Sequence, residues 1–214
     1  MSKVTAPLLS FSASGSIAKT QVYSSWKGRP YARRYVIPAN PNTAEQQETR
    51  STFAWLNAVW GYMPAAAVAA WQLYGDNNRF TDRNGWIKQN LPVLRGDANN
   101  NDMIFSPAAG GGIPAAAIAV TPGNDQLQVV LTAPSLPTGW TITKAVFAVM
   151  RQQDPQSGTL YQVTAMEDAT AAYDVTFTGL ASAQTYVVGG WFVYAKDDLS
   201  PAYGRALMTT GLTT

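Results

Sequence analysis

The segment at residues 42–74 is the only long stretch of the chain with a helical pattern, and it constrains the fold of the N-terminal half most strongly. Thr43 and Gln46 match the Ser/Thr-x-x-Glu/Gln capping box, which predicts that a helix begins near Ala44. The large apolar side chains that follow recur at helical spacing: Phe53, Leu56, Val59, Trp60 and Met63. This spacing places them on one face of the helix, where they can be buried together.

Two further helices are expected after this one. Pro64 suits the start of a second helix, whose apolar face continues through Val68 and Trp71. A third short helix is predicted over residues 82–90, because Pro92 disfavours helical backbone at the residue before it. Trp residues at helical spacing belong to a core far more often than to a cofactor site, so we expect the helices to form a packed layer.

The residues before this helical layer predict a basic hairpin. Strand-like segments at residues 17–23 and 30–37 flank a short turn in which Gly28 can adopt a positive φ at little cost. Six cations precede Glu45, the first acidic residue: Lys3, Lys19, Lys27, Arg29, Arg33 and Arg34. This arm therefore carries +6, whereas the rest of the chain, with nine basic and thirteen acidic residues, carries −4.

Two interpretations of this charge separation stay open. A basic arm can dock on an acidic partner surface, on a neighbouring copy or on nucleic acid. The cations can equally be the solvated face of a hairpin, since surface charge alone decides little. The rings among them, Tyr23, Trp26, Tyr31 and Tyr35, resemble a platform for stacked bases. Packing against another layer is the commoner role of such rings, so nucleic acid is not the expected partner.

Two residue types that dominate enzyme chemistry are absent. The 214 residues include no Cys and no His, which excludes disulfides, the common zinc sites, Ser-His and Cys-His triads and histidine acid–base catalysis. Asp and Glu are few and scattered, so paired carboxylates are not indicated. The longest apolar run, residues 65–71, is too short to cross a bilayer, and residues 1–10 lack the apolar core of a secretory signal. We therefore expect a soluble protein without enzymatic activity, cofactor, metal or membrane contact.

A Pro/Gly-rich segment at residues 107–114 is the clearest boundary in the sequence. Three consecutive Gly residues flanked by Pro predict a linker. Beyond it, turn signals recur at sandwich-like intervals, and Leu127, Val129 and Leu131 alternate with polar residues. The predicted fold is an α+β N-terminal attachment domain (1–106, with a basic β arm at 1–41 and helices over about 44–91), the linker (107–114) and an all-β sandwich (115–214).

The sandwich resembles a fibronectin type III domain. The stretches that carry the likeness are Thr-Pro-Gly-Asn-Asp-Gln-Leu-Gln-Val-Val-Leu-Thr-Ala-Pro-Ser at 121–135 and Val-Thr-Phe-Thr-Gly-Leu-Ala-Ser-Ala-Gln-Thr-Tyr-Val-Val at 175–188. Gly179 followed by Tyr186 fits the tyrosine corner at the start of the sixth strand. The family usually has Trp where this chain has Leu131, so Trp140 or Trp191 is expected to fill the core. The resemblance implies an immunoglobulin-like sandwich and no particular function.

The N-terminal half is similar to small virion proteins of tailed bacteriophages. The matching positions are Gly15, Trp-Lys-Gly-Arg-Pro-Tyr at 26–31, Asn-Pro-Asn-Thr at 40–43, Gln46, Gln47, Arg50 and Trp71. The resemblance implies a structural virion protein, assembled in the host cytoplasm and partnered by other capsid or tail proteins and by copies of itself. The first expectation is a capsid decoration or head/tail accessory protein that attaches through its N-terminal half and displays the sandwich.

The contacts expected to carry attachment lie on the arm, because interface anchors favour Arg, Trp and Tyr. They are Trp26, Lys27, Arg29, Tyr31, Arg33 and Arg34. The alternative is a tail module that binds carbohydrate or a cell-surface receptor through exposed aromatic residues of the sandwich. The candidates for that role are Trp140, Tyr161 and Trp191.

Overall fold

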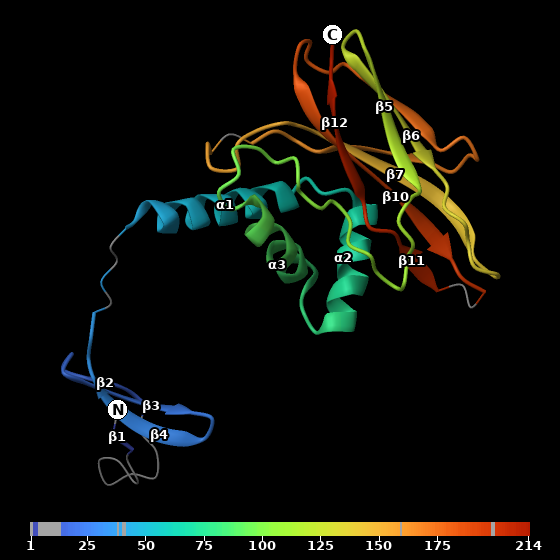
Figure 1. Cartoon of the computed structure of the whole chain (residues 1–214). Coiled ribbons are helices and arrows are strands. Elements are labelled where there is room, and N and C mark those ends of the chain that lie inside the picture. The colour runs from blue at the N-terminus through green and yellow to red at the C-terminus, as the bar shows by residue number, and fades with distance from the viewer. Residues whose placement is uncertain (1, 4–13, 38, 40–41, 159, 198–199) are drawn as a thin grey trace. The chain divides into compact units, whose positions relative to one another are not determined.

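The chain forms two compact units, residues Met1–Asn42 and Thr43–Thr214. The computed structural model describes residues 2–3, 14–37, 39, 42–158, 160–197 and 200–214 (Figure 1). The first unit, called the arm below, is an antiparallel sheet with the strand order β1-β4-β3-β2. The second unit, called the body, holds the helices and two further sheets.

The arm contains β1 (Ser2–Lys3), β2 (Gly15–Ile17), β3 (Gln21–Trp26) and β4 (Arg29–Arg34). The helices of the body are α1 (Ala44–Trp60), α2 (Ala65–Asn78) and α3 (Asp82–Leu94). Its strands are β5 (Ala117–Gly123), β6 (Gln126–Thr132), β7 (Thr141–Arg151), β8 (Thr164–Asp168), β9 (Asp174–Thr178), β10 (Thr185–Ala195), β11 (Pro201–Tyr203) and β12 (Leu207–Leu212).

The predicted helix starts are confirmed, and one predicted helix end is wrong. The Thr43 hydroxyl caps α1 by accepting a hydrogen bond from the Gln46 N–H at 3.4 Å. The third helix does not stop before Pro92 but continues to Leu94. Proline in the last turn removes one intrahelical hydrogen bond only. The buried Asn90 side chain also fixes this turn, because its Oδ1 accepts from the Ile104 N–H at 2.7 Å.

The sheets of the body form a β-sandwich. One sheet has the order β5-β6-β9, and the other has the order β11-β10-β7-β8, with β12 also paired to β10. The predicted alternation in β6 is confirmed, since Leu127, Val129 and Leu131 are buried while Gln126 and Gln128 are exposed. The interior cluster between the sheets is apolar and includes Phe147, Phe177, Phe192 and Tyr194.

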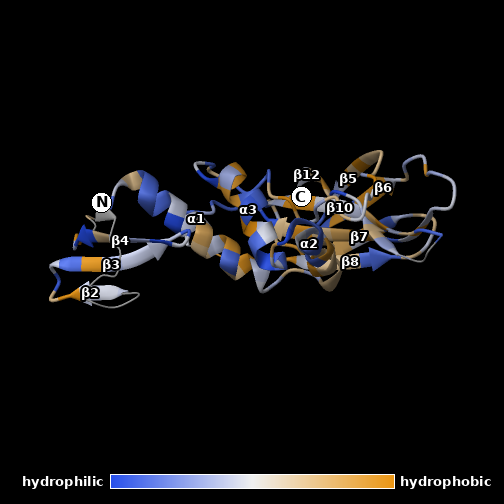
Figure 2. Cartoon of the chain, turned by 90° about the horizontal axis from the view of Figure 1, so that it is seen from below, coloured by the Kyte–Doolittle hydropathy of each residue, from blue (hydrophilic) through white to orange (hydrophobic). Residues whose placement is uncertain are grey.

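The helices cover the other face of the larger sheet, so the body has three layers (Figures 1 and 2). Trp71 and Trp86, both fully buried, share a cluster with Val146 and Ala148 of β7 and Trp191 of β10. Apolar side chains therefore leave both faces of β7 and β10, and these strands are buried over residues 145–150 and 186–194. The expectation that the Trp residues of the helices are core residues is confirmed.

The structure divides the chain elsewhere than at the predicted linker. Residues 107–114 belong to the body, where Ala109 and Tyr203 exchange backbone hydrogen bonds of 3.0 and 2.9 Å. A Cβ on Gly112 would lie 2.1 Å from the Tyr203 carbonyl oxygen, so glycine here permits close approach of two backbones. The helices consequently share a core with the sandwich and do not form an α+β domain with the arm.

The buried face of α1 also differs from the predicted stripe. Leu56 and Val59 are fully buried, but Phe53 is 46% exposed. Thr52 and Trp55 are buried in its place. The helix is rotated so that the Trp55 indole ring, the largest available side chain, lies in the cluster beneath the helices.

Candidate functional site

The tip of the arm is a two-residue hairpin turn. Lys27 and Gly28 connect β3 and β4 with positive φ angles of 50° and 74°. Positive φ at both central positions is typical of a type I′ turn, whose twist matches that of the flanking strands. The turn pairs Trp26 with Arg29 and Ser24 with Tyr31. The predicted hairpin is confirmed, and its register fixes which side chains share a face.

One face of the hairpin gathers four of the six predicted contact residues. Directly paired residues, and residues two apart along a strand, lie on the same side of a sheet. Trp26, Arg29, Tyr31 and Arg33 therefore share one face. The Trp26 ring is 66% exposed, and the Lys27 ammonium lies 4.8 Å from its centroid, so Lys27 joins this face through a cation–π contact. We call these five residues the arm face.

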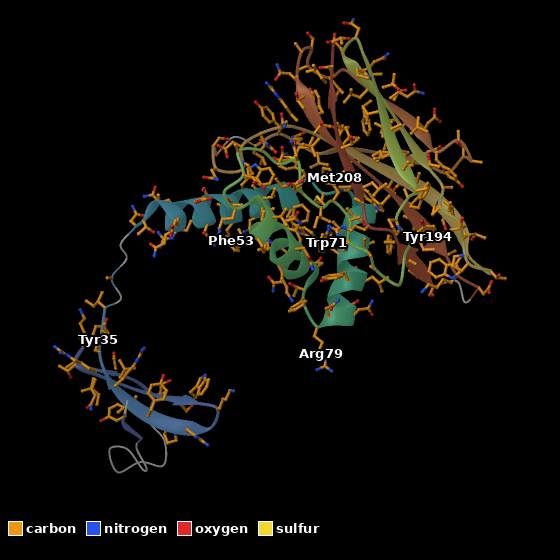
Figure 3. All side chains as sticks on the ribbon, in the orientation of Figure 1. Tyr35, Phe53, Trp71, Arg79, Tyr194 and Met208 are labelled. Atoms are coloured by element: carbon orange, nitrogen blue, oxygen red, sulfur yellow. The ribbon has the colours of Figure 1, made fainter. Side chains whose placement is uncertain are left out.

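Arg34 does not belong to the arm face. It pairs with Gln21 and lies on the opposite side of the sheet, together with Tyr23. Figure 3 shows side chains standing out from both sides of the arm. Arg34, one of the six predicted contact residues, therefore points away from the other five, because adjacent residues in a strand point in opposite directions.

The cations of the arm have no acidic partner inside the arm. No acidic residue precedes Glu45, and the one salt bridge found among the described residues joins Lys144 and Glu167 of the body at 2.7 Å. Exposed and unpaired guanidinium groups project a positive potential into solvent. The arm is therefore electrostatically suited to an acidic surface outside itself.

The arm also lacks a core of its own in the described residues. Ala32 is the one arm residue among them that is buried, whereas Ile17, Val36 and Ile37 are exposed apolar side chains. A sheet normally buries one face against another layer. Sequence reasoning did not single out Val36 and Ile37, because it predicted a strand through Ile37 and the sequence does not show that these side chains are exposed.

The described part of the body has no arrangement typical of a catalytic or metal site. No group of three or more His, Cys, Asp or Glu residues that could hold a metal occurs in it. A hollow of about 190 Å³ beside Trp71, Tyr74 and Arg205 has no carboxylate in its lining. No helix in the described ranges has the length and apolar character needed to cross a membrane.

The aromatic residues proposed for glycan binding occupy different environments. Trp191 is fully buried beneath the helices, so it cannot contact a glycan and instead fills the core as expected. Trp140 is partly buried against Tyr194, with the Lys196 ammonium 5.0 Å from its centroid. The Tyr161 ring lies 4.6 Å from the Arg151 guanidinium. Both remaining rings are thus engaged by cations of the same chain.

Two tyrosine hydroxyls stabilise the sandwich. The Tyr186 hydroxyl at the start of β10 accepts a hydrogen bond from the Ala181 N–H at 2.8 Å, which confirms the predicted tyrosine corner. The Tyr194 hydroxyl donates to the Ile113 carbonyl oxygen at 2.7 Å. Burial, together with the nearby Tyr173, raises the pKa of Tyr194 to about 12. This hydroxyl is a neutral structural donor.

Comparison with known proteins finds similarity in fold alone. No protein-family model matches the chain, and no curated protein sequence matches it. A computationally redesigned β-sandwich protein is 20% identical and covers 47% of this chain and 88% of its own length, with a TM-score of 0.35. The fibronectin type III domain of the human collagen alpha-1(XX) chain is 22% identical and covers 51% and 91%, with a TM-score of 0.37. A crystal structure of a human collagen XX fibronectin type III domain is 16% identical and covers 50% and 98%, with a TM-score of 0.36.

These TM-scores are low, and the description of the fold rests on the chain itself. Its strand order and its tyrosine corner define a β-sandwich of the fibronectin type III kind. Sandwiches of this kind serve many functions, so the site has to be argued from the arm.

Proposed function

We propose that this chain is a non-enzymatic structural protein that docks through the arm face on an acidic surface of a larger protein assembly and so attaches its body there. The observation that carries the proposal is the arm face itself. Trp26, Lys27, Arg29, Tyr31 and Arg33 project from a sheet that has no acid and almost no buried residue among its described positions. Such a sheet gains both charge neutralisation and apolar burial from a partner.

The side chains of the arm face suit a protein surface. Arg29 and Arg33 can each bind a carboxylate through two parallel N–H donors, a geometry that lysine cannot reproduce. Trp26 and Tyr31 supply large ring areas with few rotatable bonds, which is typical of interface anchors. The exposed apolar side chain of Ile17 favours a partner with apolar surface over a nucleic-acid backbone.

The likeness of the N-terminal half to small virion proteins makes a tailed-phage particle the assembly that we favour. In that setting the chain acts as a capsid decoration or head/tail accessory protein. The absence of His and Cys from the sequence, and of paired carboxylates from the described structure, supports a non-enzymatic role.

Charge reversal on the arm face tests this function. The double variant Arg29→Glu and Arg33→Glu should lose cosedimentation with the particles, because its contact residues then repel acidic groups. The matched control is Arg79→Glu with Arg83→Glu, which changes net charge equally at exposed positions of the body; Figure 3 shows Arg79 at the end of α2. The control should still bind, and binding of the unaltered chain should weaken as salt is added. Equal binding by both variants would contradict the proposal.

A further inference from the structure

The segment that follows β4 lies outside the strands of the structure. Its first residue, Tyr35, donates its backbone N–H to the Thr20 carbonyl oxygen at 2.8 Å, and no such backbone hydrogen bond is found for Val36 or Ile37 among the described residues. The sequence predicts a strand through Ile37, but β4 ends at Arg34. Val36 and Ile37 are 67% and 76% exposed. Tyr, Val and Ile are among the strongest strand-forming residues, and their favourable energy comes from packing on neighbouring strands. We call residues 35–37 the donor segment.

The body offers an open sheet edge. β8 is the terminal strand of the order β11-β10-β7-β8, and it pairs with β7 along one side only. Among the described residues, no backbone hydrogen bond outside that ladder involves β8. An open edge of this kind presents unpaired N–H and C=O groups to any extended chain that approaches it.

We propose that the donor segment of one copy adds as an antiparallel strand to the β8 edge of a second copy. Strand addition is a common mode of peptide recognition, in which backbone hydrogen bonds supply affinity and the side chains set the register. Of the arm face, Arg33 alone takes part in this contact. Trp26, Lys27, Arg29 and Tyr31 stay available for docking on a particle.

One antiparallel register matches the two segments in charge and polarity along most of their length. It places Arg33 opposite Asp168, Arg34 opposite Glu167, Tyr35 opposite Met166, Val36 opposite Ala165, and Ile37 opposite Thr164. Charges of opposite sign meet at one end, and apolar side chains meet in the middle, where Met166 is 39% exposed.

Both carboxylates at the acidic end remain able to receive an arginine. Glu167 binds Lys144 through Oε2, which leaves Oε1 for the incoming guanidinium. Asp168 Oδ2 accepts hydrogen bonds from the Thr170 hydroxyl and the Asp174 N–H, but Oδ1 accepts from the Thr170 N–H alone, at 2.8 Å, and has a lone pair left for a guanidinium. The hydrogen bonds from Thr170 also lower the pKa of Asp168. On the donor side, β4 pairs with β1 only at Tyr31 and Ala32, so its edge beyond Ala32 is open in the described residues.

The reach of the chain favours a second copy over the same molecule. Six residues separate Ile37 from Ala44, the first residue of α1, and a fully extended chain of this length spans roughly 20–25 Å. α1 has 17 residues and is about 25 Å long. The C-terminal half of α1, with Leu56 and Val59, shares a cluster with Ala165 of β8, whereas the donor segment precedes the N-terminal end of α1 in the chain. To pair with β8 of its own copy, the donor segment would have to run back along most of α1, so we assign the acceptor edge to a second copy.

Each copy carries one donor segment and one acceptor edge at different places. Contacts of this head-to-tail kind close into a ring or continue as an open chain, depending on the rotation between neighbours. The inferred assembly is thus a row or ring of identical copies.

Cysteine cross-linking tests the register directly, because the chain has no native Cys. Ile37→Cys and Thr164→Cys are made in separate full-length chains and mixed under mild oxidation. Directly opposite residues have Cα separations of about 4.5–5.5 Å, within the range of a disulfide. We expect a covalent heterodimer of the two variants, identified by mass spectrometry and removed by reductant. In the matched control, Asp76→Cys at an exposed position of α2 replaces Thr164→Cys. Heterodimer yield no higher than in this control would overturn the proposal.

Light scattering supplies the second readout. The full-length chain should have a mass above that of one chain, and Val36→Asp with Ile37→Asp should reduce it to one chain. Both positions are exposed and lie outside any helix or strand, so the substitutions should not affect folding. Val93→Asp, at another exposed apolar position, should leave the mass unchanged. A chain that stays monomeric, or a double variant that assembles like the unaltered protein, would refute strand addition while leaving arm docking intact.

Discussion

Gly189 and Gly190 allow the three layers of the body to approach one another. They are adjacent in β10, so their missing side chains would point to opposite faces of the larger sheet. A Cβ on Gly189 would lie 2.4 Å from the Phe105 ring, and one on Gly190 would lie 2.8 Å from Leu131. Glycine at these two positions therefore makes room for a buried side chain on each face.

Adding one methyl group at this place should cost stability. Gly189→Ala should lower the free energy of unfolding by about 1–3 kcal/mol, because Phe105 is fully buried and has to move. Urea unfolding followed by circular dichroism measures this change. In the control Gly61→Ala the nearest atom is 3.4 Å away, and the expected change is within about 0.5 kcal/mol. Equal effects of the two substitutions would show that the close approach at Gly189 is not energetically important.

Tyr194 predicts a loss of stability at alkaline pH. Its pKa is about 12 in the folded chain, above the usual tyrosine value of 10.0. Between these values the unfolded chain releases the proton while the folded chain retains it, so the free energy of unfolding should fall as pH rises from about 10 to about 12. Tyr194→Phe should show a smaller decrease than the unaltered chain across this window. Tyr62→Phe, at an exposed position, should reproduce the unaltered profile, and identical profiles for all three chains would exclude Tyr194 as the cause.

The strands of the sandwich differ in how much of their environment the sequence predicts. In β6 the alternation of Leu127, Val129 and Leu131 with polar residues correctly indicated one buried face. β7 and β10 instead contain unbroken apolar runs, at residues 145–150 and 187–194. Such runs are typical of strands buried on both faces. These runs are the sequence signal for a helical layer on the outer face of this sheet. A search for alternating polar and apolar residues alone does not detect it.

Glycine-rich sequence was ambiguous in a similar way. The run Gly110, Gly111 and Gly112 predicts a linker because glycine lacks a side chain to pack. In the structure the same property lets the backbone pack against Tyr203. The composition of a glycine-rich segment does not show whether it is a flexible linker or packs closely against another backbone, because the partner strand is about 90 residues away in sequence.

The shared core predicts that the helices and the sandwich unfold together. Trp71→Ala should lower the free energy of unfolding of the whole body by about 3–5 kcal/mol, because the ring contacts Trp86 within the cluster that also holds Trp191. Far-UV circular dichroism and tryptophan fluorescence should report one coincident transition. Trp26→Ala, in the arm, should leave this transition unchanged. Separate transitions for helices and strands would mean that the two layers are independent.

At the scale of the whole molecule, the charge and the aromatic content of the arm indicate a candidate site in the sequence. The arrangement of its side chains on one face could not be predicted. The sequence locates every cation of the arm and the turn at Gly28, but face membership depends on the register that pairs Trp26 with Arg29. That register separates Arg34 from Arg33. The exposure of Val36 and Ile37 could not be predicted either, because it depends on β4 ending at Arg34.

The division of the chain into two units makes the proposed attachment role of the arm testable by truncation. The arm and the body are separate compact units, and both core clusters lie within Thr43–Thr214. The body should therefore fold without the arm, and it retains all thirteen acidic residues but loses six cations. Docking on an acidic surface should be lost with the arm, while the stability of the body should not change.

The most direct test compares cosedimentation of the full-length chain and of residues 43–214 with the particles. The account predicts that the shorter chain unfolds at the same midpoint as the body in the full-length protein, yet remains in the supernatant while the full-length chain sediments. A shorter chain that sediments as well as the full-length protein would place the docking surface on the body and contradict the role assigned to the arm.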